Sequence, residues 1–177
     1  MREIPRNRPA VKITLDYKEL KRPGDTRCLA EAVTTVDAGF NELPTIPPSL
    51  EDFPNTRTVR LNHNQLEELP DALGNLSELR ILNVSANPLK CFPRVLLRLR
   101  ELEVLHLDQT GLAEIPPDYR PTKLIQLSLG TNKLTHLPES LFAQGALLRS
   151  LALHHNQLTS LPRTIGNLSA LEELDLS

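Results

Sequence analysis

The strongest constraint on the fold is a pattern of leucines that recurs about every 23 residues. The stretch LNHNQLEELP at residues 61–70 has a near twin, LHHNQLTSLP, at residues 153–162, and the two start 92 residues apart, or four intervals of 23. The shared pattern is L-x-x-L-x-L-x-x-N-x-L-x-x-L-P, in units that start at residues 33, 56, 79, 102, 124, 148 and 171. Seven such units indicate a stack of repeated coils rather than one conventional core.

Each position in the unit has a physical reason. Leucines two apart, such as Leu105 and Leu107, lie on one side of a strand. A single short strand cannot bury them, but strands stacked at ~4.8 Å form a parallel sheet with a continuous leucine ladder inside. The repeated asparagine should form a second ladder, because an amide both donates to and accepts from backbone groups at the turn. The L-P step should start a short helical turn on the convex side.

The fourth unit departs from this pattern. Thr110 replaces the asparagine, and a hydroxyl satisfies fewer backbone groups than an amide, so this turn should be the weakest rung of the asparagine ladder. The unit is also one residue short and carries PPDYRPTK at residues 116–123. Its second proline argues against a regular helix there.

The sequence divides into a capping region and the repeats. Residues 1–32 are expected to form an N-terminal tail and a degenerate cap, with a strand at 11–17 and a helix at about 26–32. Residues 33–177 hold six full units and the opening strand of a seventh, with no C-terminal cap. Exposed leucines in that last strand leave two alternatives: the chain is a truncated product of a longer protein, or it dimerises through the open C-terminal edge.

The amino-acid composition limits the classes of ligand and the cellular compartment that we expect for this chain. With 20 Lys and Arg against 22 Asp and Glu, the net charge of −2 gives no reason to expect nucleic acid as a ligand. No stretch approaches the ~20 apolar residues of a membrane helix, so membrane insertion is not expected. The start of the chain has no signal-peptide run, and two cysteines suit a reducing compartment, which predicts a cytoplasmic location.

The concave face of the sheet is the candidate binding surface, because residues between the leucines point outward there and vary from unit to unit. Catalytic chemistry is not expected: the pairs Glu67-Glu68 and Glu172-Glu173 are interpreted as solvated charge, and neither cysteine has a nearby base. We expect no cofactor and no metal, since histidines two rungs apart are ~10 Å from each other. The candidate partner-binding residues are Arg60, Asn62, His63, Asn83, Ser85, His106, Asp108, Ser128, His154 and His155.

The repeat resembles the leucine-rich repeat family, specifically the 23-residue class with L-P in the middle that occurs in Ras-pathway scaffolds, plant intracellular Ras-group proteins and polarity proteins such as Scribble. The resemblance covers residues 33–177 and implies an α/β leucine-rich repeat solenoid: a curved right-handed superhelix with a parallel concave sheet and short convex helical turns. It also implies a non-catalytic interaction module or scaffold in intracellular signalling, with a small GTPase or phosphatase pathway component as partner. The alternative is the targeting module of a longer enzyme, a ubiquitin ligase or kinase, whose catalytic part is absent.

Overall fold

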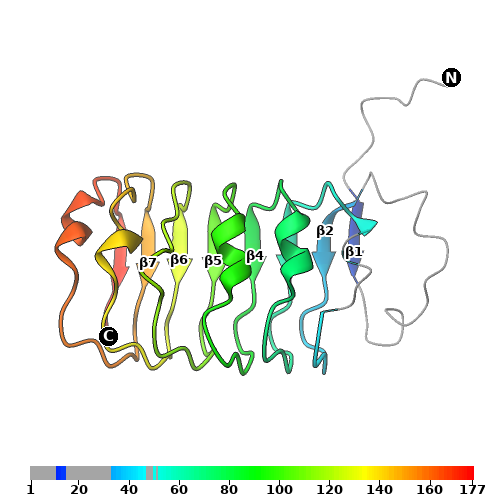
Figure 1. The fold of residues 1–177 in the computed structure, drawn as a ribbon, viewed down its shortest axis with the longest axis horizontal. Coiled ribbons are helices and arrows are strands. Elements are labelled where there is room, and N and C mark those ends of the chain that lie inside the picture. The colour runs from blue at the N-terminus through cyan, green and yellow to red at the C-terminus, as the bar shows by residue number, and fades with distance from the viewer. Residues whose placement is uncertain (1–10, 15–32, 47–49, 51) are drawn as a thin grey trace, which may run out of the picture.

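A computed structural model describes residues 11–14, 33–46, 50 and 52–177, and these form one continuous stack of coils (Figure 1). Eight parallel strands within this part of the chain make a single sheet in sequence order. The strands are β1 (Val11–Thr14), β2 (Val33–Asp37), β3 (Thr58–Arg60), β4 (Ile81–Asn83), β5 (Val104–His106), β6 (Gln126–Ser128), β7 (Ser150–Ala152) and β8 (Glu173–Asp175). The helix expected at about 26–32 lies outside the described residues.

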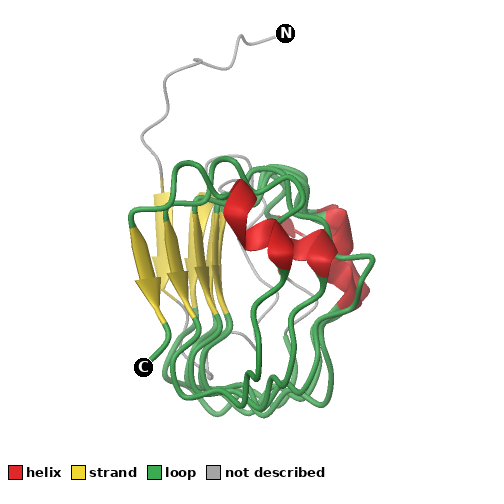
Figure 2. Ribbon diagram, turned by 90° about the vertical axis from the view of Figure 1, so that its left-hand side faces the viewer, coloured by secondary structure: helices red, strands yellow, loops and turns green. Residues whose placement is uncertain are grey.

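Short 3-10 helices cover the side of the stack opposite the sheet, as Figure 2 shows. They are η4 (Asp71–Asn75), η5 (Arg94–Arg98), η6 (Glu139–Leu141) and η7 (Arg163–Asn167). Each begins directly after the proline of the L-P step, which has an extended backbone and needs no N–H of its own. The expected α/β solenoid, with its parallel concave sheet and short convex helical turns, is therefore confirmed.

The register of the sheet places the repeated leucines in one file. Leu82 pairs with Leu105, Leu105 with Leu127 and Leu127 with Leu151, and the file continues into Leu174. Leu82, Leu105 and Leu151 are completely buried. At the N-terminal side, β1 joins the same sheet, with Ile13 opposite Val36 exactly one repeat later. The leucine pattern thus determines the strand alignment along the whole stack.

The repeated asparagines form the predicted second ladder. The Oδ1 atom of Asn87 accepts a hydrogen bond from the Leu66 N–H at 3.0 Å, and its Nδ2 atom donates to the carbonyls of Leu61 and Val84, both at 2.9 Å. Equivalent bonds surround the other ladder amides, which are Asn64, Asn132 and Asn156. Each amide satisfies backbone groups of its own coil and of the coil before it, and so ties successive coils together.

Thr110 interrupts this ladder. Its hydroxyl lies 2.8 Å from the Leu107 carbonyl of its own coil and 2.9 Å from Asn132 Oδ1 of the next coil. Within the described residues, the Thr110 side chain makes no hydrogen bond to the preceding coil, and the Leu89 N–H there donates to the Asn87 carbonyl two residues away. A threonine is too short to make the amide's bridge, so the link between the third and fourth units is the weaker one.

Replacing Thr110 by Asn is expected to raise the free energy of unfolding by about 1 kcal/mol, the net value of an added buried hydrogen bond. The new amide would reach the Leu89 N–H and the Val84 carbonyl, as Asn87 reaches Leu66 and Leu61. Urea denaturation followed by circular dichroism measures the change. Thr159→Asn, at an exposed position, is the matched control and should leave the urea midpoint unchanged. A lower midpoint for the Thr110 variant would contradict the account of the ladder.

Ion pairs also connect successive coils. Arg57 pairs with Glu78 at 3.0 Å, Arg80 with Glu103 at 2.8 Å and Arg149 with Glu172 at 3.0 Å. The side chain of Glu103 is 32% exposed and the other five are about half exposed or more, so each pair contributes only about 0–1 kcal/mol to stability. The two partners of each pair lie close to one repeat apart in the sequence, so these pairs favour the observed register of the strands.

The fourth unit has no helix at residues 116–123, a segment that the structure describes in full, and the prediction from its second proline is confirmed. The N–H of Tyr119 donates to the Pro116 carbonyl, as the N–H of Leu73 does to Pro70 in the second unit. The chain then reaches Pro121, which has no N–H to continue the turn. The column of helices is therefore broken between η5 and η6.

Candidate functional site on the concave sheet face

The concave face carries the residues that lie between the buried leucines, and a cluster of hydrogen bonds on it centres on Asp108. Asp108 Oδ1 accepts hydrogen bonds from the Ser128 hydroxyl at 2.6 Å and the Gly130 N–H at 2.8 Å. Asp108 Oδ2 lies 3.2 Å from the Ser85 hydroxyl, which also accepts from the Asp108 N–H. One carboxylate thus fixes side chains from three successive coils. It offers a partner a preorganised negative charge.

The Ser128 side chain lies beneath this cluster and is not exposed on the concave surface. Its side chain is buried, and its hydroxyl is committed to Asp108. Ser85 and Asp108 themselves are only half-buried. Ser128 therefore positions the carboxylate that a partner would meet.

His106 lies at the end of β5, two residues before Asp108, and is half-buried. Removal of the imidazole from water lowers the pKa of His106 below its ordinary value of 6.5, and the nearby charge of Asp108 opposes this shift only in part. The centre of the face consequently presents a neutral imidazole beside a carboxylate at physiological pH.

The lowered pKa of His106 predicts that stability falls in acid. The unfolded chain binds a proton near pH 6.5, whereas the folded chain resists binding it until a lower pH. The contribution is therefore fully present above pH 6.5 and is lost as the pH falls through the folded-state value. Urea midpoints between pH 8 and pH 5 should decline less steeply for His106→Gln than for the wild type. Parallel declines would show that His106 is not responsible. His136→Gln, at an exposed loop position, serves as the control.

The N-terminal end of the face combines charge with an exposed aromatic side chain. Arg60 lies 3.9 Å from Asp37, and the side chain of Asn62 lies over Gly39, where an added Cβ would be 2.9 Å from its Oδ1. The rings of Phe40 and His63 stack with centroids 4.4 Å apart and an angle of 13°. Phe40 is 76% exposed, so this stack presents an apolar surface to solvent.

The other end of the face is built from histidines. The ring of His154 lies over Gly130, where a Cβ would be 2.2 Å from its Cε1 atom, so only glycine leaves room for it. His154 Nδ1 is 3.1 Å from Asp175 Oδ2, although it has no hydrogen bond of acceptable geometry within the described residues. His155 meets His154 edge to face, with centroids 5.4 Å apart.

A column of left-handed residues borders the face. In the part of the chain that the structure describes, six non-glycine residues have φ between 52° and 57°, and each directly precedes a residue of the asparagine ladder or its equivalent. They are Phe40, His63, Ala86, Gln109, Thr131 and His155. The N–H of each donates to a carbonyl of the next coil at 2.8–3.0 Å, which continues the bonding of the sheet while the chain turns. The turn therefore holds each of these residues in a conformation that costs an L-residue roughly 1–2 kcal/mol.

The structure brings the candidate residues together in three groups. Asn83, Ser85, His106, Asp108 and Ser128 form the centre, where Asn83 Oδ1 also accepts from the Ser85 N–H at 3.0 Å. A second group, at the N-terminal end, holds Arg60, Asn62 and His63, and a third, at the opposite end, holds His154 and His155.

Two residues outside the candidate set belong to this face. Asp37 pairs with Arg60, and Phe40 stacks on His63. Both occupy the same position of the repeat as a candidate residue one unit later, since Asp37 precedes Arg60 and Phe40 precedes His63 by 23 residues. The repeat spacing is thus the sequence signal that finds them, whereas a search restricted to polar side chains passes over Phe40.

In the described part of the chain, no group of three or more His, Cys, Asp or Glu side chains is arranged to hold a metal ion. Nor does any helix among these residues have the length and apolar character needed to cross a lipid bilayer.

Comparison with known proteins identifies the repeat. Two models of the leucine-rich repeat match the chain, one at residues 122–177 and the other at residues 55–76. The fold superimposes on a leucine-rich repeat protein of Leptospira interrogans with a TM-score of 0.71 and 25% identity, over 82% of this chain and 43% of that one. The chain is a leucine-rich repeat protein. The narrower assignment to the 23-residue intracellular class stays a prediction.

Further relatives of this leucine-rich repeat protein match over shorter parts. Lumican of Rattus norvegicus is 42% identical over 59 residues, and osteomodulin of Bos taurus is 38% identical over 65 residues. These matches cover 32% and 37% of the chain but only 18% and 15% of the relatives. The plant structure PEPR1–AtPEP1 is 31% identical with a TM-score of 0.72, over 82% of this chain and 21% of that one. The chain therefore spans less than half the length of each of these proteins.

The relatives overturn the predicted cytoplasmic location. Lumican and osteomodulin are secreted extracellular matrix proteins, so that prediction is wrong. It depended on the small number of cysteines and on the first residues of the chain. The same relatives are non-enzymatic binding proteins, and leucine-rich repeat domains generally mediate contacts between proteins.

Proposed function

We propose that this leucine-rich repeat protein is a non-catalytic module that binds a protein partner through its concave face. The observation that carries the proposal is the hydrogen-bonded cluster around Asp108, in which three coils hold one carboxylate in place. Because those groups are ordered before binding, a partner would lose little conformational entropy in meeting them. The solved complex of PEPR1 with AtPEP1, which has the same fold, supports a protein or peptide as the partner.

The two ends of the face would add contacts of different kinds. Phe40 with His63 supplies an exposed aromatic pair of the type that anchors interfaces, while Arg60 supplies a cation. His154 and His155 supply polar rings at the other end. Asn62, Asn83, Ser85, His106 and Asp108 would provide hydrogen bonds between them, with Ser128 holding Asp108 in place.

Selection of binding peptides on the immobilised protein tests this proposal. A displayed random peptide library should yield sequences that bind the wild type, and the double variant His106→Lys with Asp108→Lys should lose at least about tenfold in affinity for them. Phe40→Ala should lose affinity for those that contact the N-terminal end. Asp71→Lys, which makes the same Asp-to-Lys change at an exposed position on the helical side, is the control and should bind as the wild type does. Retained binding by the double variant, with loss in the control, would place recognition on another surface.

Other functions expected from the sequence are not part of this proposal. The role in intracellular signalling, with a small GTPase or phosphatase pathway component as partner, depended on the cytoplasmic location and forms no part of this proposal. The targeting module of a longer ligase or kinase stays an untested alternative. The dimer through the C-terminal edge also stays a prediction, which sedimentation at two protein concentrations would test.

A further inference from the structure

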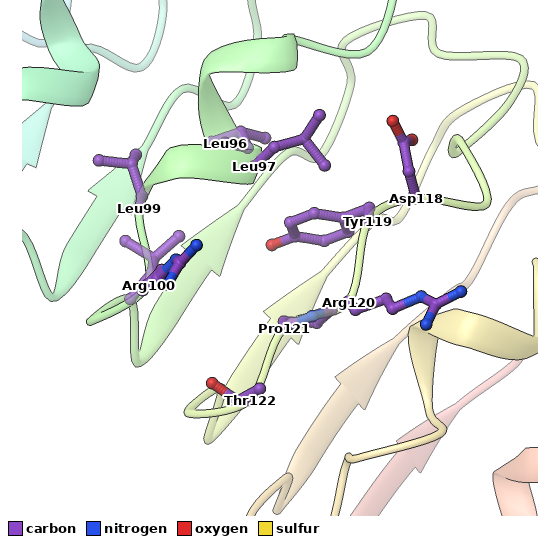
Figure 3. Close-up of a pocket in the computed structure, with 10 residues that line it drawn as sticks. Leu96, Leu97, Leu99, Arg100, Asp118, Tyr119, Arg120, Pro121 and Thr122 are labelled. Atoms are coloured by element: carbon purple, nitrogen blue, oxygen red, sulfur yellow. The ribbon is translucent and has the colours of Figure 1, made fainter.

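The broken column of helices leaves a pocket on the convex side, remote from the concave face (Figure 3). Its volume is about 500 Å³, within the ~300–1,000 Å³ range of small-molecule sites. It lies between η5 and the irregular segment of the fourth unit, and it is lined by Leu96, Leu97, Leu99, Arg100, Leu102, Asp118, Tyr119, Arg120, Pro121 and Thr122.

The pocket lies where the fourth unit departs from the sequence of the other units. In the second and third units, the residue after each 3-10 helix, Leu76 or Leu99, is a buried leucine whose N–H caps the helix. The shortened fourth unit runs from Tyr119 through Pro121 to Thr122 and has no such leucine at this point. The space next to Leu99 is consequently left unfilled.

The walls of the pocket differ in chemistry. Leu97 on η5 is half-buried, and Leu99 and the ring of Tyr119 are buried, so one part of the wall is apolar. Tyr119 packs on Phe92 with ring centroids 4.9 Å apart, which fixes its ring. Asp118 is engaged by Arg94 at 3.1 Å, so the acidic residue of the pocket is already neutralised.

Two hydrogen-bond donors face the open space. Figure 3 shows the guanidinium of Arg100 and the hydroxyl of Tyr119 pointing toward one another, whereas the side chain of Arg120 extends away. Among the described residues, Arg100 has no ion pair or side-chain hydrogen bond. Burial raises the pKa of the Tyr119 hydroxyl, so it keeps its proton at physiological pH and remains a donor.

We propose that this convex pocket binds a small organic carboxylate with an apolar body, independently of the protein partner of the concave face. The carboxylate would pair with Arg100, whose planar guanidinium suits two-point contact with a carboxylate, and accept a hydrogen bond from Tyr119. The apolar body would lie against Leu97, Leu99 and the Tyr119 ring. A protein that gained such a site would carry two binding surfaces on opposite sides of one stack.

The probe for this site is 1-naphthoate, titrated into the full chain and followed by nuclear magnetic resonance. Arg100→Gln should weaken its binding at least about tenfold, because the charge-assisted pair is lost. Tyr119→Phe keeps the ring and removes the hydroxyl, and should weaken binding about threefold. Arg120→Gln removes the same charge from the same pocket and is the matched control, with less than about a twofold effect expected. Circular dichroism confirms that each variant is folded.

The uncharged analogue 1-naphthamide separates the carboxylate from the apolar body. It should bind at least about tenfold more weakly than 1-naphthoate. Equal losses in Arg100→Gln and Arg120→Gln would overturn the proposal, since they would indicate attraction to net charge alone. It would also be overturned by equal affinity for the amide, or by the absence of any spectral change at millimolar naphthoate.

Discussion

Replacing Asn87 by Ala is expected to lower the free energy of unfolding by about 3 kcal/mol. The side chain is 1% exposed, accepts from the Leu66 N–H and donates to the carbonyls of Leu61 and Val84. Alanine would leave the Leu66 N–H and the Val84 carbonyl buried without side-chain partners, whereas the Leu61 carbonyl would keep its bond from Asn64. Each buried group without a partner costs about 1–3 kcal/mol. The loss would fall on two adjacent coils at once, because the amide bridges them.

Urea denaturation of the whole chain measures this effect. Asn75→Ala makes the same chemical change at an exposed position, where the side chain, among the described residues, accepts a hydrogen bond only from Arg98, at 3.1 Å. That control should shift stability by no more than about 0.5 kcal/mol. A comparable loss in both variants would mean that the ladder contributes no more than an ordinary surface amide.

Replacing Leu105 by Ala should destabilise the protein by about 3–4 kcal/mol. Leu105 is completely buried on β5, between Leu82 and Leu127 of the neighbouring strands. Its removal would leave a cavity between two coils that contact little else. Because each coil of a repeat protein is stabilised mainly by its neighbours, the coupling between the two halves of the stack should weaken as well.

Hydrogen exchange locates this second effect. Amide protons in β4, β5 and β6 should lose more protection than those in β2 and β3, while the urea midpoint of the whole chain falls. Leu147→Ala removes a leucine that is 52% exposed and should change the midpoint little. A uniform loss of protection along the chain would instead show that the stack unfolds as a single unit.

Features that follow from the repeat could be predicted from the sequence. The alignment of Leu82 with Leu105 and Leu127 follows from spacing alone, since a strand with period two must stack in that register to bury its leucines. The asparagine ladder and the missing helix near Pro117 follow from the chemistry of single residues. In each case one residue type has one way to satisfy its backbone or its apolar surface.

Features that depend on several side chains together could not be predicted. The burial of Ser128 arises because Asp108 of the preceding coil reaches over it, and the stacking of Phe40 on His63 requires the left-handed conformation of both. The convex pocket lies beside the shortened fourth unit, but the sequence alone does not show whether neighbouring side chains fill that space. The cytoplasmic location was predicted wrongly because a fold does not indicate the cellular compartment in which a protein acts.

The left-handed column bears on how such a protein can change its specificity. At each of its six positions the backbone N–H, which every residue except proline possesses, makes the bond to the next coil. The side chain makes no part of that bond, so exchange among unbranched residues would alter what the rim displays without altering the turn. New partners could be acquired along this rim one substitution at a time, at nearly constant stability.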